Sequence, residues 1–469
     1  MAVDFQKEVD ARKEDLLNDL IELLKVPSVR DDEAATEDAP LGPGPRDALL
    51  KFLEIGERDG FKTKNVDNLA GYMEYGEGDE MLGIIGHVDV VPVGQGWETD
   101  PFEPVIKDNR IYARGSSDDK GPMMAAYYAL KIIKDLELPV SKRVRFIFGT
   151  DEETGWTGMN HYLEVEEVPD FGFSPDAEFP IINGEKGNMV ANIHTKGAND
   201  GEYQLVKFEA GLRPNMVPEE AVAEVKMPVD AEDAMAESFA KFMDESPVTG
   251  EIDFDDDIAI IKVHGKAAHG ATPQAGENAA TYLAAFLKDY NFNGAAKEYL
   301  EIAGTYLHND PFAEKLGLRE HDEKMGDLTM NVGIFSFDQN SDDNTINLNF
   351  RFPTGTDKAI TDKVAEVLSP KFDITVELLP GTHVPHYVPG DDPLVQTLLD
   401  VYHEHTGLPA HEQVIGGGTF GRLLERGVAY GAAFPDSIDT MHQANEFMDL
   451  DDLYRAAVIY ADAIYRLIK

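Results

Sequence analysis

The sequence predicts an α/β protein in which a discontinuous domain, with a mixed sheet flanked by helices, is interrupted by an inserted α+β domain built on antiparallel sheet. Short apolar runs alternate with amphipathic segments over residues 1–186, which is typical of an α/β sheet. Alternating apolar and polar residues, typical of antiparallel strands, prevail over residues 187–382. Helix and strand signals alternate again over residues 383–469. We therefore expect residues 1–186 and 383–469 to form one domain and residues 187–382 another.

The first domain is expected to begin with helices and to continue with buried strands. Apolar residues at helical spacing predict an amphipathic helix over residues 5–25, which Val26-Pro27-Ser28 ends. An acidic loop rich in proline and glycine separates it from a helix over residues 47–56. Further elements follow from apolar runs: strands over residues 71–75, 82–85, 111–112, 144–148 and 171–173, and a helix over residues 123–136.

The inserted domain shows the period of two that half-buried strands require. At about 195 residues the insert is long enough to have its own core. Two helices and five strands are expected there: helices over residues 231–244 and 279–290, and strands over residues 190–194, 258–263, 329–337, 345–351 and 374–379. The chain then returns to the first domain and closes with a helix over residues 450–468.

Length and charge restrict the class of protein. With 469 residues the chain is long for one hydrophobic core, which favours two or more domains. The formal net charge of −47 argues against nucleic acid and anionic membranes as partners, because both would be repelled. A solvated acidic surface accounts for most of this charge, which also favours metal ions as ligands. No run approaches the ~20 apolar residues that cross a bilayer, and the charged N-terminal segment lacks a signal-peptide core. We expect a cytoplasmic protein.

Cysteine is absent from the sequence, which excludes disulfides, thiolate metal sites and a cysteine nucleophile. Any metal ion must therefore be held by His, Asp and Glu. Such ligands suit a hydrolytic ion such as zinc or manganese.

One histidine follows a buried strand directly. The run MLGIIGHVDVVP (residues 81–92) places His87 and Asp89 at the end of an apolar segment that Gly86 interrupts. Side chains two residues apart on a strand share a face, so Asp89 can reach the imidazole of His87. A carboxylate there fixes the tautomer of a metal-binding histidine. A histidine satisfied within the core is an equally valid interpretation of this pair alone.

Other potential ligands also stand at strand ends or in the loops after them. Because the carboxyl ends of strands in an open α/β sheet border one crevice, these groups are expected to converge there. Two histidines with carboxylates could hold two divalent ions if one carboxylate bridges them. For any single acid in so acidic a chain, surface solvation is the better interpretation, but the ordered set is hard to obtain by chance. The set is His87, the pair Asp118-Asp119, the pair Glu152-Glu153, Asp176 and His442.

The two adjacent glutamates are expected to have different roles. Glu152 and Glu153 would diverge on a continuing strand, but Thr154-Gly155 marks its end. One carboxylate can then bind metal while its neighbour faces the water as a general base.

The order of these motifs and the residues within them resemble the co-catalytic metallopeptidase family that includes aminoacylases, carboxypeptidase G, carnosinases and succinyl-diaminopimelate desuccinylase. Within it the chain is most similar to the bacterial PepV-type dipeptidases, and the similarity covers nearly the whole chain. The segments that carry it are GIIGHVDVVP, RGSSDDKGP, FSPDAEFPIINGE, HYVPGDDP, VIGGGTFGRL and MHQANE.

The resemblance implies a residue-by-residue assignment of the metal site. His87, Asp118 and Asp176 would bind one metal ion, and Asp118 would bridge to a second ion bound by Glu153 and His442. Zinc is the expected metal, with manganese and cobalt as alternatives. Asp89 would orient His87, and Glu152 would be the general base and later the proton donor. The family also implies a cis peptide between Asp118 and Asp119.

The resemblance assigns roles to the inserted domain, which would act as a lid. His269, in a loop rich in glycine and alanine, would stabilise the oxyanion, although by its sequence context alone it could be merely structural. Arg351 would clamp the C-terminal carboxylate of the substrate with help from Asn215; otherwise this arginine simply pairs with an acid. Outside the insert, Gly417 and Thr419 stand before an expected helix and could also meet an anionic group. A phosphate loop is disfavoured there because no lysine follows in the P-loop pattern.

We therefore expect a cytoplasmic two-metal dipeptidase that hydrolyses short unblocked peptides with broad specificity. A deacylase or desuccinylase of N-acyl amino acids, from the same family, is the alternative with the same chemistry. A non-catalytic acidic metal-binding protein is the alternative from another class. Because the insert would supply its own histidine, a monomer is sufficient, and a dimer is not excluded.

Overall fold

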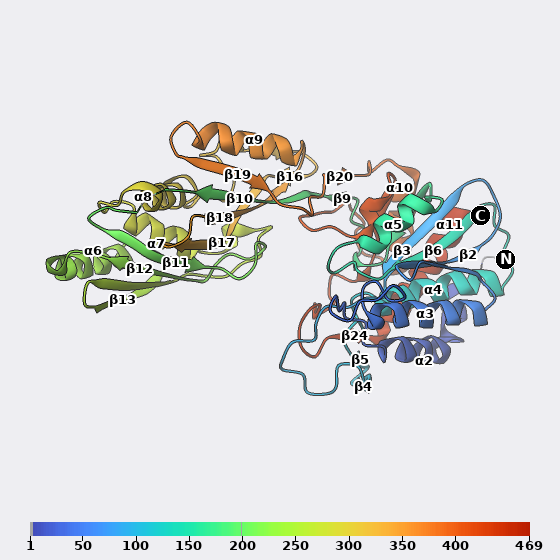
Figure 1. Cartoon of the computed structure of the whole chain (residues 1–469). Helices are drawn as coiled ribbons and strands as arrows, with labels where there is room; N and C mark the ends of the chain where they lie inside the picture. The colour runs from blue at the N-terminus through green and yellow to red at the C-terminus, as the bar shows by residue number, and fades with distance from the viewer. Residues whose placement is uncertain (1–2, 198) are drawn as a thin grey trace. The chain divides into compact units, whose positions relative to one another are not determined.

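The computed structural model describes residues 3–197 and 199–469, and the chain divides into two compact units (Figure 1). The α/β unit comprises Met1–Gly184 and Tyr387–Lys469, and the inserted unit comprises Glu185–His386. The sequence placed these boundaries at residues 186 and 383. Helices and a mixed sheet in the first unit, with antiparallel sheet in the second, confirm the predicted fold class.

A mixed sheet forms the centre of the α/β unit, with strand order β1-β2-β6-β3-β7-β22. The strands β6, β3, β7 and β22 run parallel, and β2 and β1 extend the sheet antiparallel at one edge. Their bounds are β1 Lys62–Val66, β2 Ala70–Tyr75, β3 Met81–His87, β6 Arg143–Gly149, β7 Phe171–Ser174 and β22 Gly427–Ala429. The parallel strands are consequently the ones whose carboxyl ends share an edge.

Both faces of this sheet are covered, as the continuous apolar runs of its parallel strands require. Ile84 belongs to the larger core and its neighbour Ile85 to a smaller one on the opposite face. The larger core is completed by the helices α1, α2, α3, α4, α10 and α11, and the smaller core lies beneath α5 (Figure 1). The helices span α1 Phe5–Asp10, α2 Lys13–Leu24, α3 Pro43–Arg58, α4 Lys120–Asp135, α5 Thr157–Val165, α10 Pro393–Thr406 and α11 Leu450–Ile468.

The helix expected over residues 5–25 is two helices, α1 and α2. The Arg12 amide donates to the Val9 carbonyl instead of the Glu8 carbonyl, which accepts from the Arg12 guanidinium. This exchange interrupts the helical pattern of hydrogen bonds. Helix α3 begins four residues earlier than predicted, because Pro43 and Pro45 occupy its first turn, where proline costs no hydrogen bond.

Short elements complete the α/β unit. A small sheet has the order β24-β5-β4, and β8 pairs in parallel with β23. The short elements are β4 Val105–Lys107, β5 Arg110–Tyr112, β8 Ala177–Glu178, β21 Val414–Ile415, η4 Phe420–Leu423, β23 Ala432–Ala433 and β24 Phe447–Asp449, and β9 Gly184–Glu185 and β20 His386–Tyr387 fall on the two boundaries between the units in the chain.

An antiparallel sheet with the order β13-β14-β12-β11-β17-β18-β10-β19 forms the inserted unit (Figure 1). Its strands are β10 Gly187–Thr195, β11 Gln204–Ala210, β12 Glu220–Lys226, β13 Thr249–Asp255, β14 Ile258–His264, β17 Thr329–Asp338, β18 Asn344–Phe352 and β19 Ile374–Leu378, with β15 His321–Asp322 and β16 Gly326–Asp327 as a separate hairpin. Burial alternates along β10, as expected for a sheet with one face in the core.

Helices cover the buried face of this sheet and share one hydrophobic core with it. They are α6 Glu232–Asp244, α7 Ala279–Leu287, α8 Gly294–Glu301, the π-helical turn η3 Ile302–Tyr306 and α9 Asp357–Leu368, while the 3₁₀ turns η1 Val229–Ala231 and η2 Pro273–Ala275 contribute no residue to this core. Several polar side chains of β18 are buried, among them Asn347, Asn349 and Arg351. Across residues 3–197 and 199–469, no helix is both long and apolar enough to cross a membrane.

Candidate metal centre

Three parallel strands deliver the first candidate ligands to one edge of the sheet. His87 is the last residue of β3 and lies opposite Gly149, the last residue of β6. Glu152 and Glu153 follow β6, and Asp176 follows β7, which also pairs in parallel with β3. Glycine is required at position 86, beside His87, because a Cβ at position 86 would lie 2.5 Å from Oδ2 of Asp119. The parallel register therefore gathers these residues, as predicted for the carboxyl ends of strands.

The first group of ligand atoms consists of His87, Asp118 and Asp176. Nε2 of His87 lies 3.0 Å from Oδ1 of Asp118 and 3.5 Å from Oδ2 of Asp176. All three ligand atoms lie within 4.8 Å of one another, close enough to surround a single ion.

The second group consists of Asp118, Glu153 and His442. Nε2 of His442 lies 3.0 Å from Oδ2 of Asp118 and 3.2 Å from Oε2 of Glu153. Asp118 thus offers one oxygen to each histidine, which is the arrangement that a bridging carboxylate needs. Nitrogen and carboxylate oxygen donors fit divalent zinc, manganese or cobalt. The five residues predicted as ligands lie together in two groups that share one residue.

Asp89 has a wider role than the sequence indicated. Nδ1 of His87 hydrogen-bonds the main-chain oxygen of Asp89 at 3.0 Å, and Oδ1 of Asp89 lies 3.3 Å from the same nitrogen. The Asp89 carboxylate also accepts the backbone N–H groups of Glu152 and Glu153, at 3.1 and 3.2 Å. It therefore fixes both the imidazole of His87 and the loop that carries the two glutamates.

Glu152 belongs to neither ligand group and sits beside both. Burial raises its pKa well above the usual value; the positive charge of His87 opposes this rise, and the charges of Asp176 and Glu153 add to it. A carboxyl group with a raised pKa can take up and return a proton near neutral pH.

The ligands perturb one another strongly. Hydrogen bonds to Asp118 and Glu153 raise the pKa of His442 to about 10. Burial and the charge of Asp118 raise the pKa of Glu153 to about 7. Burial acts against ionisation of Asp118, but hydrogen bonds from the two histidines hold its pKa below the usual value. Without metal ions, protons therefore balance the charge of these carboxylates. The Asp118–Asp119 peptide is cis, as the resemblance implied.

A buried ion pair, absent from the sequence prediction, supports the shared ligand. Glu446 and Arg114 have side chains only 1% exposed and are joined by a contact of 2.7 Å. The Glu446 carboxylate also accepts the backbone N–H groups of Gly115, Ser117 and Asp118, at 3.1, 2.9 and 3.2 Å, and the Ser117 hydroxyl at 3.0 Å. It holds the segment that ends in Asp118. The motif MHQANE contained this glutamate, but an acid in an acidic chain gives no separate signal.

In the inserted unit, Asn215 and His269 lie on adjacent backbone segments. The Gly270 amide donates to the Asn215 carbonyl at 2.8 Å, and the Val217 amide donates to the Ala268 carbonyl at 2.9 Å. The buried amide of Asn331 donates to the carbonyls of Pro214 and Met216. The loop requires glycine at position 211, where φ is +79°. A Cβ at this position would lie 1.8 Å from the Gly333 carbonyl oxygen.

The protonation state of His269 follows from its contacts. Nδ1 accepts the Ala271 amide at 3.2 Å, so the neutral imidazole carries its proton on Nε2. Burial, and then the charge of Arg351, lower the pKa of His269. At neutral pH this side chain is therefore a hydrogen-bond donor and not a cation. Arg351 itself is buried, with 6% of its surface exposed.

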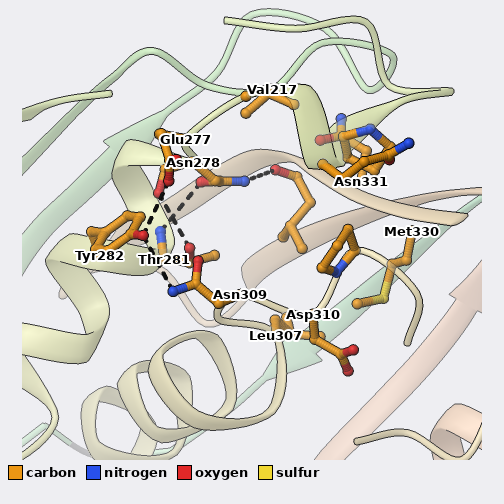
Figure 2. Close-up of a pocket in the computed structure, with 15 residues that line it drawn as sticks. Val217, Glu277, Asn278, Thr281, Tyr282, Leu307, Asn309, Asp310, Met330 and Asn331 are labelled. Carbon is orange, nitrogen blue, oxygen red and sulfur yellow. Dashed lines mark hydrogen bonds between the residues drawn. The ribbon is translucent and has the colours of Figure 1, made fainter. Parts of the chain in front are cut away.

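The segment after His269 is anchored by the start of α7, beside a pocket of about 330 Å³ (Figure 2). Asn278 caps the helix by accepting from the amides of Ala280 and Thr281, and its own amide donates to Val332. The Tyr282 hydroxyl donates to Glu277 at 3.0 Å. This network holds the His269 loop at its second end.

The prediction of a helix after Gly416-Gly417-Gly418-Thr419 is wrong. The residues that follow form only η4, a four-residue 3₁₀ turn, in which Oγ1 of Thr419 accepts the Gly421 amide. So short a turn has no appreciable dipole to attract an anion, because the dipole is a sum over aligned peptides. Gly417 and Thr419 can act only through individual hydrogen bonds.

Residues 83–466 match the peptidase family M20/M25/M40. The chain belongs to this family. A β-Ala-Xaa dipeptidase of Lactobacillus delbrueckii subsp. lactis is 45% identical over 476 aligned positions, which cover 100% of this chain and 99% of the relative. Membership of a peptidase family identifies the chain as an enzyme, against the alternative of a non-catalytic metal-binding protein.

Solved structures share the fold of this peptidase. Aminoacylhistidine dipeptidase from Vibrio alginolyticus aligns with a TM-score of 0.60 at 12% identity, covering 97% of this chain and 96% of that one. Human carnosine dipeptidase 1 aligns with a TM-score of 0.58 at 14% identity, covering 99% and 98%. At such identities the likeness shows the fold alone.

Replacing Glu446 should weaken the metal centre as well as the fold. Glu446→Ala leaves the Arg114 charge buried without its partner, which should lower the free energy of unfolding by about 3–5 kcal/mol in urea titrations. Zinc affinity, measured by competition with a chelator, should fall about 10–100-fold. Leu20→Ala, in the core of the same unit, is the control: it should cost about 2–5 kcal/mol and leave zinc affinity unchanged. Equal zinc affinities in the two variants would show that Glu446 does not position Asp118.

Metal binding should release protons. The pKa of His442 is raised to about 10 and that of His87 is also raised, so both imidazoles are protonated at pH 7.5 and must lose their protons to bind metal. Calorimetry of zinc binding in buffers of different ionisation enthalpy should give about two protons released per chain, and affinity should rise with pH. In His442→Ala the number of protons released per chain should fall by about one. No proton release would contradict the placement of His442 between two carboxylates.

Proposed function

We propose that this peptidase hydrolyses unblocked dipeptides with the help of two divalent metal ions. The observation that carries the proposal is the pair of ligand groups that share Asp118, with Glu152 next to both but part of neither. The name of the Lactobacillus relative, a β-Ala-Xaa dipeptidase at 45% identity over the full chain, supports the substrate class.

His87, Asp118 and Asp176 would hold one ion, and Asp118, Glu153 and His442 the other. When bound, such a pair of ions lowers the pKa of a water molecule and polarises a carbonyl beside it. Zinc is the metal we propose, since imidazole and carboxylate ligands suit it.

Glu152 moves the proton in this reaction. Its carboxylate accepts a proton from the attacking water and returns it to the nitrogen of the peptide bond as the C–N bond breaks, which gives a free amine and a free carboxylate. The backbone of Glu152 is held by Asp89, so the base keeps its position relative to His87.

His269 would stabilise the developing negative charge on the scissile carbonyl oxygen. The proton on Nε2 can be donated to that oxygen, because the contact with Ala271 occupies the other ring nitrogen. One well-placed donor of this kind contributes about 10²–10³ in kcat. The inserted unit would then act as the lid that the resemblance implies.

The C-terminal carboxylate of the substrate would be bound by Arg351 and Asn215 of the inserted unit. A planar guanidinium can pair with both carboxylate oxygens. Such recognition reads the ends of a dipeptide and permits broad side-chain specificity. We propose a cytoplasmic enzyme for which a monomer is sufficient, since one chain contains every residue named.

A set of end-blocked substrates tests the proposal. Leu-Gly should be cleaved at least tenfold faster, in kcat/KM, than N-acetyl-Leu-Gly. It should also be cleaved about 10–100-fold faster than Leu-glycinamide, because the amide lacks the charge that Arg351 binds. In Arg351→Lys the preference for the free carboxylate should shrink, since lysine cannot make the bidentate contact. Faster cleavage of the N-acetylated peptide would identify a deacylase instead.

Replacing each of the two adjacent glutamates should impair the enzyme in a different way. Glu152→Gln should lower kcat by about 10²–10⁴ while the chain retains both zinc ions, because only the proton carrier is lost. Glu153→Gln, the matched control, should lose zinc from the second site. Steady-state kinetics and elemental analysis of dialysed protein measure both effects. A Glu152→Gln variant with full kcat would exclude this residue as the base.

A further inference from the structure

A cavity of about 320 Å³ lies within the α/β unit, and the ligand Asp176 forms part of its wall. This volume is at the lower end of the range for small-molecule sites. The cavity is bordered by the ends of β8 and β23, by the loop that precedes His442 and by the start of α11. It therefore adjoins the metal centre without containing it.

The inner surface of this cavity is largely apolar. Ile182, Ala432 and Phe434 are buried in its wall, and Ile415 and Met441 are half-buried. Ile438 is 60% exposed, which is unusual for a large aliphatic side chain. These side chains offer an apolar ligand group contacts that water cannot make.

The wall is held in place by contacts that do not depend on a ligand. The ring of Phe434 packs 4.8 Å from that of Phe179 and lies 4.0 Å from the guanidinium of Arg455. The Phe434 amide donates to the Ser437 hydroxyl, which in turn donates to Asp452 at 2.7 Å. The turn over residues 434–437 is therefore fixed, and the cavity is preformed.

The charged residues that line the cavity are all acidic: Asp176, Glu178, Asp439, Asp449 and Asp452. No lysine, arginine or histidine is among its lining residues. Such a lining attracts an ammonium group and repels a carboxylate. Of the two ends of a dipeptide, only the amino-terminal residue suits this cavity.

We propose that this cavity binds the side chain of the substrate's amino-terminal residue and favours apolar side chains there. The inference rests on the proposed dipeptidase function, and it adds a preference that binding of the backbone ends alone would not produce. The acidic lining faces the free amino group, while Ile182, Ile415 and Ile438 contact the aliphatic chain.

Two isomeric substrates test the inference. Leu-Gly and Gly-Leu have the same composition and differ in which residue would enter the cavity. Narrowing the cavity with Ala433→Val should lower kcat/KM for Leu-Gly about 10–100-fold relative to Gly-Leu, since one methylene changes such ratios by about that much. Ile438→Asn, at an exposed position that should tolerate polarity, should lower the same ratio severalfold. Val165→Asn, an exposed position on α5 outside the cavity, is the control and should leave the ratio unchanged. Equal losses for the two peptides in Ala433→Val and Ile438→Asn would overturn the inference.

A binding measurement separates this inference from the proposed function. Leucinamide and glycinamide carry the same ammonium group and no second residue. In the zinc-loaded protein, leucinamide should shift the isoleucine Cδ1 methyl signals of residues 182, 415 and 438 in NMR spectra, and glycinamide should shift them far less. Shifts with no dipeptide cleavage would overturn the proposed function and keep the cavity as an amine site. Cleavage without these shifts would overturn the cavity assignment.

Discussion

The metal centre depends on the double contact of Asp118, whose two carboxylate oxygens each lie 3.0 Å from a different histidine. A nearly buried carboxylate needs partners on every side, because an unpaired charge in the interior is costly. Asp118 has His87 on one side and His442 on the other, and its backbone is held by Glu446. The same residue therefore joins the strand edge of β3 to the loop before α11.

Negative charge is concentrated at this edge of the sheet, and the structure limits its cost in two ways. Arg114 neutralises Glu446, and backbone N–H groups satisfy the carboxylates of Asp89 and Glu446. The remaining charge is left for protons or metal ions, which is why the pKa values of His442 and Glu153 shift in the same direction. A composition with a net charge of −47 thus contains one place where the excess of acid has a chemical use.

Much of the fold could be predicted from the sequence because it follows from local patterns, and the residues proposed as ligands from the strand ends and the family resemblance are the ones that lie together in two groups. Buried parallel strands such as β3 are continuous apolar runs, and the closing helix was predicted with the bounds of α11. Strands β11, β12 and β13 escaped prediction, and of these β13 is an edge strand whose residues remain mostly exposed. The split between α1 and α2 depends on one arginine side chain. Glu446 could not be singled out, since its importance comes from donors more than 300 residues earlier in the chain. The second role of Asp89 is hidden because its donors, the amides of Glu152 and Glu153, lie 63 and 64 residues later in the chain.

The two halves of the metal centre are far apart in the order of synthesis. Asp118 and Glu446 are separated by 328 residues, and the whole inserted unit, with its own core, lies between them. Because domains fold as units while the chain emerges, the insert can be complete before the last ligand exists. His442 follows the whole insert in the chain, so the two candidate ligand groups can come together only after the residues beyond the insert have been made. A nascent chain that ends within the insert accordingly lacks one of the two histidines of the candidate metal centre.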